Sequence, residues 1–265
     1  MWNDKTLAVV LPTYNEAGSI RRCIDEFLAT GVVDEVLVIN NNAHPDTSPL
    51  VALTKAREVH ETRQGYGAAI RRGLAETTDF DLVCVCEPDG TFDPADLFKL
   101  LPFLTDADVV FGSRTVSTYI WAEANMGPFL RWGNWAVAKL IEVLYNSVYL
   151  SDVGCTFRVL TREAIDRISP EFEGEASSFG LEMMLHVTAA RLRFVQVPVR
   201  YLPRVGESAV TGHLGKTIQL GTEMILMTLR HRLKTWRSPG GGRGGIDLRV
   251  APDQQAAASQ RAGRP

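Results

Sequence analysis

The sequence has little of what marks several common classes of protein. It has no excess of basic residues, because 28 Lys and Arg stand against 31 Asp and Glu, and the net charge of −3 gives no electrostatic reason to bind nucleic acid. Its four cysteines show no C-x-x-C spacing. The absence of that spacing argues against a zinc site or a disulfide framework and fits a reducing cytoplasm.

Long apolar runs are also lacking. No charge-free run approaches the roughly 20 residues that a membrane span needs. Residues 1–12, MWNDKTLAVVLP, do not have the basic and apolar regions of a signal peptide. We therefore expect a cytoplasmic protein that meets a membrane, if at all, only peripherally on its cytoplasmic face. With 265 residues, of which 45% are apolar, the chain is long enough for one large globular domain.

Short apolar segments alternate with amphipathic helices up to Arg114. This alternation predicts an α/β fold with a mostly parallel, Rossmann-like sheet flanked by helices. Beyond Arg114 the alternation lapses, and a C-terminal helix and a disordered tail end the chain. The expected strands are Leu7–Leu11, Glu35–Ile39, Glu58–Glu61, Leu82–Cys86, Asp108–Gly112, Asp152–Thr161 and Phe194–Val199, and the expected helices are Ser19–Ala29, Ser48–Ala56, Gln64–Glu76, Leu130–Tyr149, Phe179–Ala190 and Leu214–Trp236.

Two carboxylates follow the fourth expected strand directly. Glu87 and Asp89 are two residues apart, and Pro88 keeps the chain extended between them, so both side chains share a face at the carboxyl end of a strand. Open α/β sheets hold their ligands there. Adjacent carboxylates repel unless a cation lies between them, and Mg²⁺ or Mn²⁺ shared with substrate phosphates suits such a pair. The alternative is an acidic turn that caps the next helix.

Five motifs follow one another along the chain: LPTYNE at 11–16, GYGAA at 65–69, EPDG at 87–90, GSR at 112–114 and RVGES at 204–208. Together they resemble the family 2 glycosyltransferases of the GT-A fold, and within them the dolichyl- and polyprenyl-phosphate sugar synthases typified by dolichyl-phosphate mannosyltransferase. The resemblance implies an inverting enzyme that moves a hexose from a nucleoside-diphosphate sugar to a polyprenyl phosphate. Two alternatives stay open, namely transfer to a water-soluble hydroxyl acceptor and a catalytically silent nucleotide-binding scaffold.

The same resemblance implies a domain organisation. Residues 1–237 are the GT-A domain, in which about 1–115 bind the nucleotide sugar and about 116–212 bind the acceptor. A terminal amphipathic helix covers 213–237, and 238–265 are the disordered tail. The basic and aromatic end of the helix fits contact with a membrane, and it fits equally a helix packed on the domain whose cations compensate its dipole.

On the donor side, the resemblance implies that Pro12, Tyr14 and Glu16 line the nucleotide pocket, with Tyr14 beside the base or ribose. Asn40 and Asn41 stand where the family usually has a pair of aspartates for base recognition. Gly65 and Gly67 are implied to let the backbone approach the nucleotide closely at a helix N-terminus.

Around the reacting groups, the resemblance implies that Asp89 binds the ion directly and that Glu87, in place of the usual first aspartate, binds it directly or through water. Arg114 and Arg131 match two arginines that face the acceptor phosphate, for which guanidinium forks are suited.

Two further residues, Arg204 and Ser208, are implied to lie on a loop over the diphosphate. Asp152, Arg158 and Glu182 are open to either a catalytic or a structural interpretation.

Overall fold

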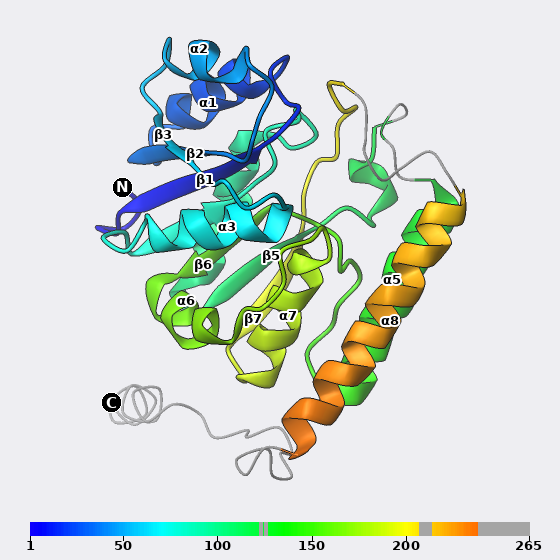
Figure 1. Cartoon of the computed structure of the whole chain (residues 1–265). Coiled ribbons are helices and arrows are strands. Elements are labelled where there is room, and N and C mark those ends of the chain that lie inside the picture. Colours follow the sequence, from blue (N-terminus) through cyan, green and yellow to red (C-terminus); the bar gives the residue numbers. More distant parts are fainter. Residues whose placement is uncertain (122–123, 125–126, 207–213, 238–265) are drawn as a thin grey trace, which may run out of the picture.

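The computed structural model of the chain describes residues 1–121, 124, 127–206 and 214–237. Their centre is one seven-stranded sheet with the order β3-β2-β1-β4-β6-β5-β7 (Figure 1). β6 pairs antiparallel with β4 and β5, and the other neighbouring strands pair parallel. This confirms the expected α/β fold with a mostly parallel sheet. The strands are β1 (Leu7–Thr13), β2 (Glu35–Asn40), β3 (Arg57–His60), β4 (Leu82–Val85), β5 (Val109–Ser113), β6 (Arg158–Thr161) and β7 (Phe194–Pro198).

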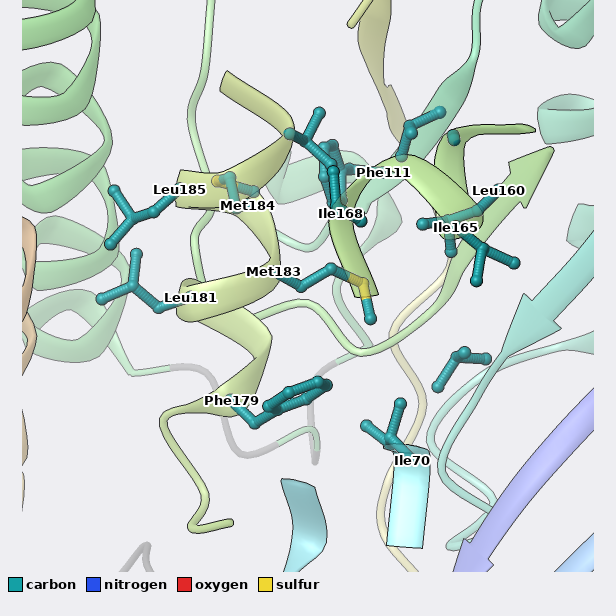
Figure 2. Packing of buried hydrophobic residues seen from close by; sticks show 14 of the residues in the cluster. Ile70, Phe111, Leu160, Ile165, Ile168, Phe179, Leu181, Met183, Met184 and Leu185 are labelled. Atoms are coloured by element: carbon teal, nitrogen blue, oxygen red, sulfur yellow. The ribbon is translucent and has the colours of Figure 1, made fainter. Parts of the chain in front are cut away.

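Helices cover both faces of the sheet. Successive side chains of β1 point to opposite faces, so Val9 packs in the cluster that contains α1, and Val10 packs in the cluster that contains α3 and α7. Figure 2 shows the second cluster, where Phe179 and Met183 of α7 point toward Ile70 of α3. The α-helices are α1 (Ile20–Ala29), α2 (Thr47–Val51), α3 (Tyr66–Ala75), α4 (Leu97–Leu100), α5 (Pro128–Tyr145), α6 (Arg162–Ile168), α7 (Phe179–Ala189) and α8 (Leu214–Arg237).

The parallel pairing brings the functional segments to one edge of the sheet. β1 and β4 are neighbours in register, with Val10 opposite Val85, so the turn after β1 and the acidic turn after β4 leave the sheet at the same edge. A third segment joins them from far along the chain, because the Leu202 N–H donates to the Thr91 carbonyl and the Val205 N–H to the Asp89 carbonyl. This edge therefore gathers residues from three distant parts of the sequence.

Three expectations about local structure were wrong. Of the strand expected at Asp152–Thr161 only Arg158–Thr161 forms, because the Asp152 carboxylate accepts the Gly154 N–H and folds that stretch into a loop. The helix expected at Ser48–Ala56 is the five-residue α2, since Thr54 turns the chain back by accepting the Ala56 N–H. The expectation omitted α6, which begins where the Thr161 hydroxyl accepts the Ala164 N–H.

At the far side of the sheet, α5 and α8 pack against each other beyond α7 (Figure 1). None of the helices in the described part of the chain is long and apolar enough to cross a bilayer. The expected tail, 238–265, lies outside the described residues.

Candidate functional site

A cavity of about 230 Å³ opens at the carboxyl edge of β1 and β4. Five residues that the sequence placed in the site line this cavity together: Pro12, Tyr14, Glu16, Glu87 and Arg204. Asn41, named with Asn40 at the position of the aspartate pair, also lines the cavity, as do residues that the sequence analysis did not assign, namely Thr13, Gln64, Tyr66, Ala69 and Ser177.

Glu16 organises the turn after β1. One carboxylate oxygen, Oε2, accepts the backbone N–H groups of Tyr14 at 2.7 Å and Asn15 at 2.9 Å. The other, Oε1, accepts from Arg204 Nη2 at 3.1 Å. Glu16 therefore fixes the wall of the cavity and ties it to the segment that arrives from the other end of the chain.

Asp89 is almost fully buried, and both of its oxygens have partners. Oδ1 accepts from the Thr91 N–H at 2.9 Å and from the Thr91 hydroxyl at 2.6 Å. Oδ2 lies 3.0 Å from Arg204 Nη1. The Arg204 guanidinium thus bridges Asp89 and Glu16, while its buried Nε has no partner within the described residues.

Glu87 is held differently from Asp89. Its side chain is half-buried on the cavity, and its carboxylate makes no hydrogen bond or ion pair within the described ranges. Burial, and then the neighbouring Asp89 charge, raise the pKa of Glu87 to about 7, although Arg204 acts in the opposite direction. The buried Tyr66 hydroxyl also lines this cavity and lacks a partner among the residues described. The floor of the cavity thus presents oxygen atoms without partners, which suits a bound polar or cationic group.

Whether this site suits a divalent cation depends on its ligands. Within the described ranges, no three His, Cys, Asp or Glu side chains gather closely enough to hold a metal ion by themselves. Glu87 and Asp89 offer two carboxylates, and Mg²⁺ and its relatives are commonly held by one or two carboxylates with water and substrate phosphates completing the shell. The residues therefore fit an ion that arrives with a diphosphate, and they do not fit an independent metal centre.

Three predicted nucleotide contacts lie elsewhere. Asn40 does not line the cavity, because its amide donates to Glu58 at 2.8 Å and to Ser48, while Asn41, the first residue after β2, lines the cavity. The space for a Cβ at Gly65 or Gly67 is filled by the backbone oxygens of residues 174–175 at 2.1 and 2.6 Å. Close packing within the chain thus accounts for both glycines, and their contact with a nucleotide stays a prediction.

Arg114 directly follows β5 and is held by a buried acid, while its contact with an acceptor phosphate stays a prediction. Its Nε and Nη2 donate to the two oxygens of the fully buried Asp152 at 2.9 and 3.0 Å, and its guanidinium lies over the Tyr201 ring. Burial alone would raise the pKa of Asp152, but the charge and hydrogen bonds of Arg114 hold that pKa below its usual value. Asp152 therefore positions Arg114.

Arg158 and Glu182 are structural in this fold. Arg158 is buried over the Phe111 ring and donates to the carbonyls of Gly180 and Cys155. The Glu182 carboxylate accepts the N–H groups of Glu173 and Gly174. Neither side chain lines the cavity.

Arg131 lies in a second cavity of about 580 Å³ beside α5. This cavity combines one cation with exposed aromatic rings and hydroxyl groups. Its lining is Ser113, Thr115, Val116, Arg131, Trp132, Trp135, Tyr149, Ser151, Gln196 and Pro198. Arg131 therefore lines the second cavity and not the donor-side cavity. Arg114 lies in sequence between Ser113 and Thr115, which both line this second cavity. Ser208 lies outside the described residues.

Comparisons with known proteins identify the family of this chain. Residues 8–169 match the model of Glycosyl transferase family 2, and the chain belongs to this family. An uncharacterized glycosyltransferase of Mycobacterium tuberculosis is 32% identical over 217 residues, covering 80% of this chain and 93% of that protein. A dolichyl-phosphate hexose transferase of Haloferax volcanii is 28% identical, covering 86% of this chain and 96% of its own.

A solved structure shares the fold. The glucosyl-3-phosphoglycerate synthase of Mycobacterium tuberculosis, in complex with Mn²⁺, UDP-glucose and phosphoglyceric acid, superposes with a TM-score of 0.65 and 20% identity, covering 87% of this chain and 80% of that chain. The chain is thus a glycosyltransferase of the GT-A type.

Proposed function

We propose that this enzyme transfers a hexose, with inversion, from a nucleoside-diphosphate sugar to a polyprenyl phosphate, with Mg²⁺ or Mn²⁺ at Glu87 and Asp89. The observation that carries the donor half is that Glu16, Glu87 and Arg204 line one cavity at the carboxyl edge of the sheet, with Arg204 also paired to the buried Asp89. Open α/β sheets bind nucleotides at this edge.

On the donor side, each side chain has a physical task. Tyr14, about half exposed at the rim, offers a ring face to the base or ribose. Arg204 is placed to bind diphosphate oxygens with its guanidinium fork. Glu87 and Asp89 hold the ion, which when bound neutralises the charge that builds on the leaving nucleoside diphosphate.

The second cavity supports a phosphate acceptor. Arg131 supplies a cation for the phosphate, and Trp132, Trp135 and Tyr149 supply apolar surface for the first isoprene units. A phosphate monoester has its second pKa near 6, so at pH 7 it is already a nucleophilic anion and needs no base. In support of such an acceptor, the two acids that the sequence left open as bases, Asp152 and Glu182, are committed to Arg114 and to backbone N–H groups. The Haloferax relative is named for a dolichyl phosphate acceptor.

The test is an acceptor and donor panel with the full chain. We expect Mn²⁺-dependent transfer from a GDP- or UDP-hexose to undecaprenyl or dolichyl phosphate. We expect none to the corresponding alcohol, which lacks the anion, or to phosphoglyceric acid, the acceptor in the mycobacterial structure. Transfer to the alcohol or to phosphoglyceric acid in preference to the lipid phosphate would reject the proposed acceptor, and binding of nucleotide without turnover of any donor would favour a scaffold.

A further inference from the structure

The long terminal helix α8 carries an apolar stripe that faces away from the protein. Its large apolar side chains Ile225, Leu226, Leu229, Leu233 and Trp236 are 38 to 69% exposed. At the helical repeat of 3.6 residues they fall within an arc of about 100°. The sequence predicted an amphipathic helix with Ile225, Leu229 and Trp236 on one stripe, and the structure turns these three outward together with Leu226 and Leu233.

The opposite side of α8 makes the contacts with the domain. Met224 and Met227 pack against the core cluster under α7, and Thr228 is fully buried. His231 Nδ1 lies 2.7 Å from the Tyr145 hydroxyl of α5 and Nε2 lies 3.4 Å from His186 Nδ1 of α7. Because this face already holds α8 in place, the outward stripe is not needed for packing within the described part of the chain.

The charges around the stripe indicate which kind of partner it could contact. Five basic residues and one acidic residue lie in α8 although the whole chain is net negative. Arg230 flanks the stripe on one side and is exposed, a position from which a long basic side chain reaches phosphate groups while its stem covers apolar surface. Arg232 flanks the other side, with its guanidinium over the Tyr145 ring of α5. A second copy of the chain would place like charges opposite one another, so self-association is disfavoured. The basic residues are Lys216, Arg230, Arg232, Lys234 and Arg237, and the acidic one is Glu223.

We propose that the outward stripe of α8 docks the enzyme on an anionic lipid bilayer, with α8 lying in the interface. An amphipathic helix with an apolar face bordered by cations, and with Trp near its end, has the chemistry of an interfacial helix. This proposal deepens the proposed function, because it brings the enzyme to the surface that holds a lipid acceptor. The residues of α8 on which it rests take no part in the proposed reaction, so the two proposals can be tested separately.

Vesicle binding of the full chain, without donor or acceptor, tests the proposal. We expect the protein to sediment with vesicles of phosphatidylcholine and phosphatidylglycerol, to bind phosphatidylcholine alone more weakly, and to be released by salt. Failure of the wild-type chain to bind the anionic vesicles would overturn it.

Variants locate the contact. The double variant Leu229→Gln/Leu233→Gln should weaken vesicle binding about tenfold or more, because both side chains leave the apolar stripe. Arg230→Gln should weaken binding to anionic vesicles about fivefold and leave binding to neutral vesicles unchanged. The matched controls are Leu53→Gln, a 65% exposed leucine after α2, and Arg21→Gln on α1. Equal binding of the double variant and the Leu53 control would overturn the proposal.

Two further measurements separate this proposal from its rivals. Light scattering that shows a dimer in the wild type and a monomer in the double variant, together with no vesicle binding, would assign the stripe to a second copy instead. Transfer to a short-chain, water-soluble isoprenyl phosphate without vesicles should be equal in the wild type and the double variant. If the wild type binds vesicles but transfers to no lipid phosphate, the proposed acceptor is wrong while the docking surface stands.

Discussion

Arg204 Nη1 lies 3.0 Å from Asp89 Oδ2, so the side chain proposed to bind the diphosphate neutralises the carboxylate proposed to bind the ion. The same guanidinium reaches Glu16 Oε1, and two backbone hydrogen bonds hold its segment to the acidic turn. A divalent cation at Asp89 repels a guanidinium at this distance. If an ion binds Asp89 together with a nucleotide, we therefore expect Arg204 to move from the carboxylate toward the phosphates.

The first prediction concerns this exchange. Arg204→Gln should bind Mn²⁺ alone more tightly than the wild type, by about tenfold or about 1.4 kcal/mol, because the competing cation is gone. With nucleoside diphosphate present the order should reverse, since the variant lacks the fork that binds phosphate. Electron paramagnetic resonance of free Mn²⁺ measures both affinities. Arg21→Gln, an exposed arginine paired with Asp25, is the control. If the variant does not bind Mn²⁺ alone more tightly than the wild type, Arg204 and the ion do not compete.

The second prediction concerns Asp89 itself. Asp89→Asn keeps the size of the side chain but removes the charge that an ion needs. If the bound ion supplies about 4 kcal/mol to the transition state, turnover should fall about 10³-fold. Single-turnover transfer measures this, and circular dichroism checks the fold. Asp79→Asn, an exposed aspartate in the turn after α3, should keep wild-type rates. Near-wild-type turnover of the Asp89 variant would reject the metal-dependent assignment.

The sequence predicted the elements around the donor cavity because their signals are local. Apolar runs such as 7–11 and 82–86 identify buried strands, and the acidic pair follows one of them directly. Glu87 could therefore be placed before the structure was known, whereas Tyr14 and Glu16 were placed by the family resemblance of the motif at 11–16. Tyr66 lies between two glycines already noted in the sequence, which was the signal that could have assigned it to the cavity.

Other features depend on contacts between distant residues and had no local signal. Arg114 pairs with Asp152, which is 38 positions away, and nothing in either segment indicates the pairing. β6 enters the sheet antiparallel between β4 and β5, although an isolated apolar segment carries no direction. Asn40 and Asn41 are equivalent in the sequence, and only the way β2 ends decides which of them faces the cavity. The apolar stripe of α8 was visible, but its outward direction was not.

The third prediction concerns the buried pair of Arg114 and Asp152. Asp152→Asn should destabilise the fold by about 3 kcal/mol, because it leaves the guanidinium of Arg114, only 12% exposed, without its counter-charge. Urea denaturation followed by circular dichroism measures the free energy of unfolding. The fully buried Asp152 is compared with the exposed Asp46, whose change to Asn should cost nothing measurable. Equal free energies of unfolding of the two variants would show that the pair orients Arg114 but does not stabilise the fold.

The fourth prediction concerns pH and the junction of α5, α7 and α8. Burial, and then the nearby His186, lower the pKa of His231 to about 4, and burial also lowers the pKa of His186. In the unfolded chain both imidazoles take up a proton near pH 6.5. Between about pH 6.5 and 4 the unfolded state therefore binds more protons than the folded state, and stability must fall as the pH is lowered through this window.

The difference between two proteins isolates this effect from that of other titrating groups. In denaturant titrations at pH 7 and pH 5, the wild type should lose more stability on acidification than His231→Gln, whose amide can still hydrogen-bond the Tyr145 hydroxyl but cannot be protonated. His60→Gln, on the exposed end of β3, should lose as much as the wild type. If His231→Gln shows the same loss as the wild type, His231 titrates equally in the folded and unfolded chains, and its burial between Tyr145 and His186 does not govern the acid sensitivity of this junction.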